Sequence, residues 1–180
     1  TAPSATGTNA VAIGSGSKAD SADAIGIGSS AWARGANVFA VFGDARAISS
    51  VAIGLGTVAS NNYSVALGRD AYALADSAVS IGKGRASGTD SLAATITNNT
   101  SSYGATGANS LAIGQLSRAT AANSVAIGDG AVSTTANLIA LGGTTDTIQI
   151  SGVFKLPTSD GTAGQVLSTD GSGNLSWITP

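Results

Sequence analysis

Short segments that alternate apolar and small residues recur along most of the chain. Each has the form small-Val-Ala-Ile-Gly or a close variant, as in residues 124–128. Successive copies end at positions 14, 28, 43, 54, 68, 82, 95, 114, 128 and 142, and most of them follow one another at the same step, as from 14 to 28 or from 54 to 68. A fixed period of this kind indicates a repeat architecture in which each copy is one structural unit.

The alternation within each copy predicts a strand, because Val and Ile alternate with Ala at period two. The repeat step also equals two heptads, so a coiled coil is the alternative. The closing Gly and the β-branched residues disfavour that helix. After the Gly, most units continue into a small-x-small triplet such as residues 71–73 or 117–119. Two short strands and two turns per unit predict one coil of a narrow β-solenoid.

The repeat divides the chain into three predicted regions. Residues 1–142 form a β-roll head of about ten coils, with a loop insertion near 96–109 that is rich in Asn, Ser and Gly. Residues 143–157 form a connector. Residues 158–180 form a β-hairpin, with strands at 165–168 and 174–177 joined across residues 170–173.

Both faces of the repeated strand are apolar or small, which predicts association. Alternate residues of a strand point to opposite sides, and we call each set one parity. In residues 125–127, one parity can fill the interior of the roll, while the other needs a second surface that excludes water. The pattern does not choose between the parities. A single roll would expose a long apolar strip, so we expect several copies to pack side by side around an axis.

Composition agrees with an all-β chain and excludes several functions. Every acidic residue is Asp, Met and Cys are absent, and aromatic residues make up 4% of the chain. A net charge of −2 disfavours nucleic-acid binding, which needs a clustered basic surface. No run of about 18 apolar residues is present, so we expect no direct insertion into a membrane.

The candidate chemistry is sparse, and we predict that the chain is not an enzyme. It has no His and no Cys, which removes the commonest general base and the thiol nucleophile. Asp20 with Asp23, and Asp70 with Asp76, could form carboxylate pairs. They lie in predicted turns, where Asp is ordinary. We therefore expect no catalytic residues, no metal site and no cofactor.

One line of residues remains as a candidate binding surface. The central residue of each small-x-small triplet should point outward and stack into an outward ladder. Arginine beside exposed aromatic rings suits sugar rings and anionic groups, although a solvent-facing variable position explains the line equally simply. The ladder candidates are Lys18, Trp32, Arg46, Tyr72, Arg85 and Arg118, together with Val58 and Val132. Asn99 and Tyr103 in the predicted loop are further candidates.

Residues 9–142 resemble the YadA-like head repeats of trimeric autotransporter adhesins. The motifs that carry the resemblance are Asn-Ser-Val-Ala-Ile-Gly at 123–128 and Asn-Ser-Leu-Ala-Ile-Gly at 109–114. The resemblance implies a homotrimer of left-handed parallel β-rolls that mediates attachment. Early copies depart from it, with Asn-Ala at 9–10 and Asp-Ala at 23–24. The third unit is also short and contains Phe39 and Phe42.

Residues 158–180 are similar to segments of phage tail-fibre-like proteins, through the run from Asp160 to Leu167 and on to Trp177. The two resemblances together imply an extracellular fibre on a bacterial cell surface or a virion tail. We predict a non-enzymatic homotrimeric adhesin module that contacts cell-surface polysaccharide or a receptor of a target cell. The alternative is a rigid spacer, with recognition carried by a further domain.

Overall fold

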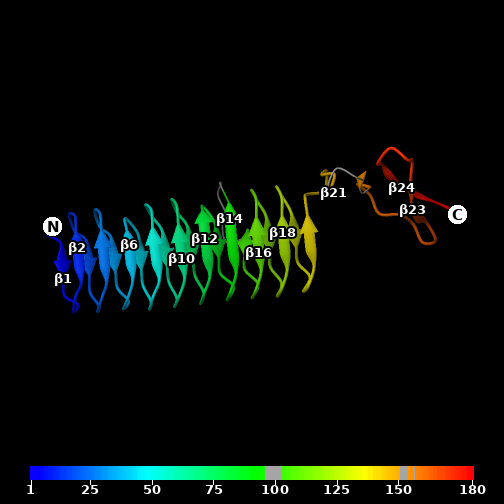
Figure 1. The fold of residues 1–180 in the computed structure, drawn as a ribbon. Coiled ribbons are helices and arrows are strands. Elements are labelled where there is room, and N and C mark those ends of the chain that lie inside the picture. Colours follow the sequence, from blue (N-terminus) through cyan, green and yellow to red (C-terminus); the bar gives the residue numbers. More distant parts are fainter. Residues whose placement is uncertain (96–102, 151–153, 156) are drawn as a thin grey trace.

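The chain folds into a slender β-solenoid followed by a hairpin segment (Figure 1). This computed structural model describes residues 1–95, 103–150, 154–155 and 157–180. Every helix or strand assigned among these residues is a strand, which confirms the all-β prediction. The described residues include no helix long and apolar enough to cross a membrane.

Twenty short strands build two parallel sheets of ten strands each. We call them the odd sheet and the even sheet. The odd sheet consists of β1 (Ser4–Ala5), β3 (Lys18–Ala19), β5 (Trp32–Ala33), β7 (Asp44–Ala45), β9 (Val58–Ala59), β11 (Tyr72–Ala73), β13 (Arg85–Ala86), β15 (Gly104–Ala105), β17 (Arg118–Ala119) and β19 (Val132–Ser133). The even sheet consists of β2 (Val11–Ile13), β4 (Ile25–Ile27), β6 (Phe39–Val41), β8 (Val51–Ile53), β10 (Val65–Leu67), β12 (Val79–Gly82), β14 (Leu92–Thr95), β16 (Leu111–Ile113), β18 (Val125–Ile127) and β20 (Ile139–Leu141).

The strand register confirms the predicted length of one coil. Val65 pairs with Val51 on one side and with Val79 on the other, so each repeated phrase lies directly on the next. Three coils depart from this regular step. Trp32 pairs with Asp44 and Val79 pairs with Leu92, both at a shorter step, whereas Leu92 pairs with Leu111 at a longer one.

The longest of these steps, from Leu92 to Leu111, contains the inserted segment. Residues 96–102 of this segment lie outside the described residues. The predicted loop at 96–109 is nevertheless too long, because β15 already pairs in register with its neighbours. Residues 106–109 then form an ordinary turn, in which Thr106 N–H donates to Ala119 O.

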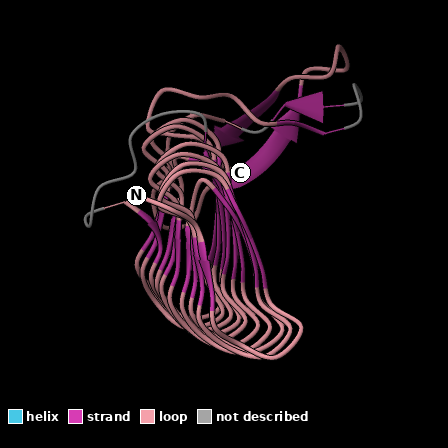
Figure 2. Cartoon of the chain, turned by 90° about the vertical axis from the view of Figure 1, so that its left-hand side faces the viewer, coloured by secondary structure: helices cyan, strands magenta, loops and turns pink. Residues whose placement is uncertain are grey.

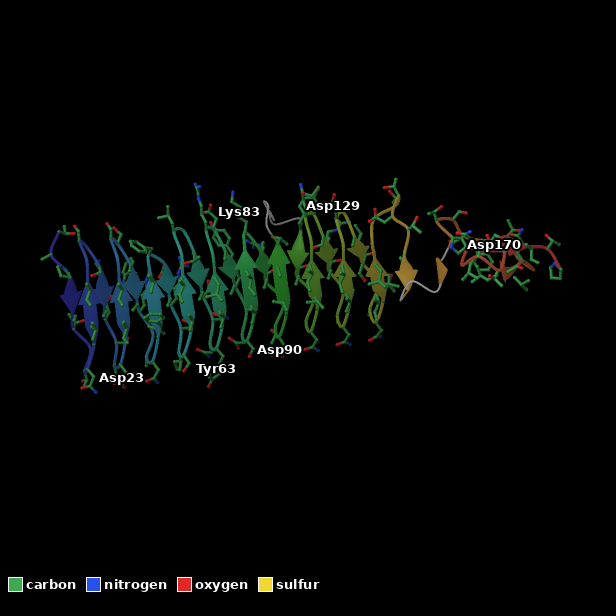
Figure 3. The ribbon with its side chains drawn as sticks, turned by 45° about the horizontal axis from the view of Figure 1, so that its top comes forward. Asp23, Tyr63, Lys83, Asp90, Asp129 and Asp170 are labelled. Carbon is green, nitrogen blue, oxygen red and sulfur yellow. The ribbon has the colours of Figure 1, made fainter. Side chains whose placement is uncertain are left out.

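Seen along the axis, the coils superimpose as a flattened loop with two turns (Figure 2). We call the turn from an even strand to the next odd strand the first corner, as in residues 14–17. The turn from an odd strand to the next even strand is the second corner, as in residues 20–24. Figure 3 shows Lys83 and Asp129 along the first-corner edge, and Asp23, Tyr63 and Asp90 along the opposite edge.

The interior of the roll contains small residues. The central residue of an even strand, such as Ala52 or Ala66, is fully buried, and so is the last residue of an odd strand, such as Ala59 or Ala73. The structure thereby decides between the two parities: the Ala parity faces inward, and the Val and Ile parity faces outward. Two sheets that close over alanine alone leave no room for larger side chains between them.

Most buried hydroxyl groups at the ends of the interior bond to the backbone, whereas the buried Thr95 Oγ1 has no hydrogen-bond partner among the described residues. At the second corner, Ser50 Oγ donates to Ala47 O at 2.8 Å, and Ser64 Oγ donates to Asn61 O at 2.6 Å. At the first corner, Thr57 Oγ1 donates to Gly54 O at 2.8 Å. Because each hydroxyl bonds within its own turn, Ser can replace Ala there without leaving an unpaired donor.

The outer face of the even sheet is apolar along the entire roll. Each even strand contributes the two residues that flank its buried centre. These are Val11, Ile13, Ile25, Ile27, Phe39, Val41, Val51, Ile53, Val65, Leu67, Val79, Ile81, Leu92, Ala94, Leu111, Ile113, Val125, Ile127, Ile139 and Leu141. Several are more than one-third exposed, among them Ile13, Ile81 and Ile139. A continuous apolar face of this length is uncommon on a single chain.

Glycine closes most even strands because neighbouring corners approach closely. Gly54 and Gly68 have φ values of 128° and 111°, and a Cβ on Gly68 would meet the backbone of Gly82 at 2.9 Å. Both the left-handed backbone and the tight stacking therefore require glycine.

The segment after Gly142 contains two antiparallel pairs. β21 (Gln149–Ile150) pairs with β22 (Phe154–Lys155) inside the predicted connector. β23 (Val166–Thr169) pairs with β24 (Leu175–Ile178), which confirms the predicted hairpin. Trp177 Nε1 donates to Ser159 O at 2.8 Å. In the hairpin turn, the Asn174 side chain and the backbone N–H groups of Ser172 and Asn174 lower the pKa of Asp170.

Candidate functional site

The outer face of the odd sheet carries the outward ladder. Each two-residue odd strand from β3 to β19 buries its second residue and directs its first residue away from the interior. The register places Lys18 beside Trp32 and Tyr72 beside Arg85. Arg118 continues the same line and is bordered by Gly104 and Val132. Five of the six predicted ladder residues therefore lie on one line.

Arg46 does not lie on the outward ladder, so its predicted position is wrong. Asp44 occupies the ladder between Trp32 and Val58, and Arg46 lies at the start of the second corner. The prediction took residues 45–47 as the small-x-small triplet. Residues 43–45 fit that pattern equally well, and Gly43 fills the buried position because this coil has a shortened first corner.

Charged side chains cluster around Trp32 and Asp44. Arg34 Nη2 and Arg46 Nε each lie close to Asp44 Oδ2, at 3.0 and 2.9 Å. Trp32 Nε1 donates to Asp20 Oδ2 at 2.7 Å. The Arg46 side chain is 44% exposed, so screening by water limits what its ion pair contributes to stability.

Two cations cover the Trp32 ring. The guanidinium carbon of Arg34 lies 3.3 Å from the ring centroid, and Lys18 Nζ lies 4.4 Å from it. These are cation–π distances. The indole is therefore partly occupied by the chain itself, which makes Trp32 a weaker stacking platform than an uncovered ring. Sequence reasoning placed Trp32 and Lys18 on this face but missed Arg34 and Asp44.

The predicted loop candidates cannot be joined to this cluster. Asn99 lies outside the described residues. Tyr103 is half-buried and precedes β15, at the position where Ala71 lies in the coil that contains β11. Tyr103 thus belongs to the start of a regular coil and not to the middle of a loop.

The acidic residues have structural partners at the corners. Asp23 accepts from Asn9 Nδ2 at 3.0 Å, and Asp76 accepts from the Asn62 N–H at 3.2 Å. Asp70 lies 3.3 Å from Arg69 Nε. Within the described part of the chain, no group of three or more His, Cys, Asp or Glu side chains could hold a metal ion.

The second corner carries a further ladder that sequence reasoning missed. One residue in each second corner has a left-handed backbone, for example Asn109, Asn123 and Asn137, with φ between 53° and 61°. Asn109 Nδ2 donates to Asn123 Oδ1 at 3.0 Å, and Asn123 Nδ2 donates to Asn137 Oδ1 at 3.2 Å. Asn tolerates this backbone better than most residues do, so the Asn that precedes five of the ten phrases was the available signal.

A hollow of about 500 Å³ interrupts the apolar face of the even sheet. It forms where Ala94 occupies a position that Ile81 and Ile113 fill in the adjoining strands. Arg69, Lys83 and Gln115 line its first-corner side. The hollow therefore belongs to the apolar face of the even sheet.

Comparison with known families decides what this rod is. The YadA head domain repeat matches residues 5–31, 45–71, 59–84 and 105–131, which together exceed half of the chain. The chain belongs to the YadA head domain repeat family. YadA head domains are adhesin modules of trimeric autotransporter adhesins, exposed on the bacterial surface, and the family is not an enzyme family. No curated protein matches the chain.

The matched ranges agree with the coil geometry. Residues 45–84 are covered by two overlapping matches, and this segment contains β8, β9, β10 and β11, which pair at the regular repeat step. The coil between Trp32 and Asp44 and the coil with the inserted segment fall in the gaps between matches. The family model therefore matches the chain where the coils follow the regular repeat step. The gaps between the matches coincide with these two irregular coils.

Proposed function

We propose that the chain is the head of a homotrimeric adhesin whose copies associate through the outer face of the even sheet. The observation that carries this proposal is the contrast between the two outer faces. Every even strand presents apolar residues outward, whereas the odd strands present Lys, Trp, Asp, Tyr and Arg. Packing of three even sheets around an axis would remove the apolar face from water and leave the odd sheets outside.

The odd sheet is then the contact surface for a target cell. Its outward ladder combines two cations near Trp32 with Tyr72, Arg85 and Arg118. Planar guanidinium groups and an aromatic ring suit the hydroxyl, carboxylate and phosphate groups of surface glycans. The proposed partner is therefore a cell-surface polysaccharide, contacted by an extracellular fibre. The likeness of residues 158–180 to tail-fibre segments stays a prediction.

Attachment by matched variants tests this proposal. Fluorescently labelled protein would be applied to a glycan array and to a panel of bacterial and epithelial cells. The ladder variant carries Tyr72→Ala, Arg85→Ala and Arg118→Ala. The control carries Tyr63→Ala, which also removes an exposed aromatic ring but lies at the second corner. We expect the ladder variant to lose attachment and the control to keep it.

Two results would contradict the proposal. If the unmodified protein attaches to no cell and no glycan, the rod is a spacer. If the ladder and corner variants attach equally well, the contact surface lies elsewhere on the molecule. Circular dichroism of both variants must show the same strand signal, so that a loss of binding is not a loss of fold.

A further inference from the structure

The shortened coil between Trp32 and Asp44 leaves out two residues of the first corner. In the preceding coil the corner runs from Gly28 to Ala31 through two intervening residues. Here Phe42 takes the place of Gly28, because Phe42 N–H donates to Ile27 O just as Gly28 N–H donates to Ile13 O. Gly43 follows at once and takes the place of Ala31.

The missing residues open a slot between two complete corners. A hollow of about 290 Å³ lies there, which we call the corner slot. Ser29 and Ser30 line it from the preceding coil, and Leu55 and Gly56 line it from the following coil. Neighbouring coils are stacked about 4.8 Å apart, so one absent corner leaves an opening about one ring thick.

The lining of the corner slot is apolar on some sides and polar on others. Phe42 is 50% exposed and Leu55 is 65% exposed, so both offer uncovered apolar surface. Ser29 and Ser30 are exposed and offer hydroxyl groups. Asp44 is the only charged residue among those that line the hollow. Asp44 Oδ2 is already paired with Arg34 and Arg46, so the hydroxyl groups that a ligand can reach in the slot are those of Ser29 and Ser30.

Phe42 is held in place before any ligand arrives. Its backbone has φ of 53°, an uncommon conformation for a bulky residue. Its ring packs over the corner of the preceding coil, since a Cβ on Gly28 would meet the ring carbons at 2.6 Å. The glycines at the equivalent position of other first corners, such as Gly28 and Gly54, also have a positive φ, so this backbone is the regular one for the corner. A fixed ring also loses little conformational entropy when it binds.

We propose that the corner slot binds one pyranose residue of a surface glycan. A pyranose ring has an apolar C–H face that can rest on Phe42 and Leu55, and a rim of hydroxyl groups that can bond to the hydroxyls of Ser29 and Ser30. The slot is one ring thick and mixes these two kinds of surface. This inference rests on the proposed function, and it identifies one sugar-binding position away from the association surface.

A variant that restores the missing corner gives the most direct test. It carries Phe42→Gly with two serines inserted between positions 42 and 43, so that the coil regains the regular length and the corner slot closes. We expect this variant to fold, because the coils that contain β9 and β11 have complete corners of this form. Leu116→Ala is the matched control, since Leu116 is an exposed corner leucine outside the slot.

Binding would be measured with methyl glycosides of glucose, galactose, mannose and N-acetylglucosamine. Trp32 lines the slot, so its fluorescence reports occupancy in a Trp177→Phe background that leaves one tryptophan. Saturation-transfer NMR gives an independent readout. We expect at least one neutral glycoside to bind, and the corner-restored variant to lose that binding by at least about tenfold.

The results separate the corner slot from the proposed function. If no neutral glycoside binds, or if the corner-restored variant binds as well as the unmodified protein, the corner-slot proposal is overturned. Attachment to cells is then measured with the same variants. Attachment that persists without sugar binding in the slot leaves the adhesin proposal standing, whereas sugar binding without cell attachment contradicts the adhesin proposal alone.

Discussion

The two outer faces of the roll enclose one common interior but carry opposite kinds of residue. In one coil, Val125 and Ile127 face outward from the even sheet, while Arg118 faces outward from the neighbouring odd strand. Inside, Ala126 and Ala119 are equally buried. The interior therefore restricts the size of the inward-facing residues equally in both sheets. The difference between their outward-facing residues must come from what each outer face contacts.

The sharpest test of this difference uses two residues of similar exposure. In one chain, Ile127 is 38% exposed and Val132 is 44% exposed, so a monomer would tolerate a charge equally at either site. In a trimer that packs through the even sheets, Ile127→Asp would bury an unpaired carboxylate in each copy, a cost of several kcal/mol. We expect Ile127→Asp to abolish the trimer in light scattering.

Val132→Asp is the matched control and should leave the mass of the assembly unchanged. Equal behaviour of the two variants would show that the even sheet is not the association surface. A trimer broken by Val132→Asp alone would assign the association surface to the odd sheet.

A second test asks whether the two sheets share the interior equally. Ala66 in the even sheet and Ala73 in the odd sheet are both fully buried. A leucine at either site adds three carbons to a space that alanine fills, so we expect Ala66→Leu and Ala73→Leu each to cost about 3 kcal/mol. Thermal unfolding followed by circular dichroism measures both. A loss confined to one sheet would mean that the other sheet can move outward.

The third test measures what the odd face contributes to stability. Trp32→Ala removes two cation–π contacts and the hydrogen bond to Asp20, for a loss of about 1 kcal/mol. Thermal unfolding measures the loss in the intact assembly. Tyr72→Ala is the control on the same ladder and should cost less. An equal loss from both variants would show that the cluster around Trp32 adds no stability of its own.

The smallest expected effect comes from a buried hydroxyl. Ser64→Ala removes the hydrogen bond to Asn61 O, yet Ala78 occupies the equivalent position in the next coil. We expect a loss of about 0.5 kcal/mol in thermal unfolding. Ser64→Leu provides the contrast, because leucine is larger than Val38, which is buried at the equivalent position of another coil, and its extra volume should cost more than the lost hydroxyl. If Ser64→Ala were the more damaging of the two, polarity and not size would govern the interior.

Sequence reasoning predicted the coil because its signal is repeated ten times, but it could not predict which parity is inside. A strand such as Val65–Leu67 alternates with period two in either orientation, and only the separation of the sheets excludes valine from the interior. The hairpin at β23 and β24 was predictable from Asp170 and the following glycines, since that turn chemistry is local.

The candidate site was predicted less completely, for a geometric reason. Lys18, Trp32, Tyr72, Arg85 and Arg118 follow from counting along regular coils. Arg46 was misplaced because two residues are missing from one corner, and a triplet that ends one residue after Asp44 satisfies the same pattern. The corner slot was missed for the same reason. It forms because one first corner is two residues shorter than the corners on either side, and this gap appears only when the neighbouring coils are stacked in the structure.

The alanine interior also bears on how long such a rod can be. Because each coil presents nearly the same small residues to the coils before and after it, no coil requires one particular neighbour. A gene encoding this rod can therefore gain or lose whole repeat units by recombination without creating a packing defect. Copy number alone would then set how far the fibre tip stands from the cell.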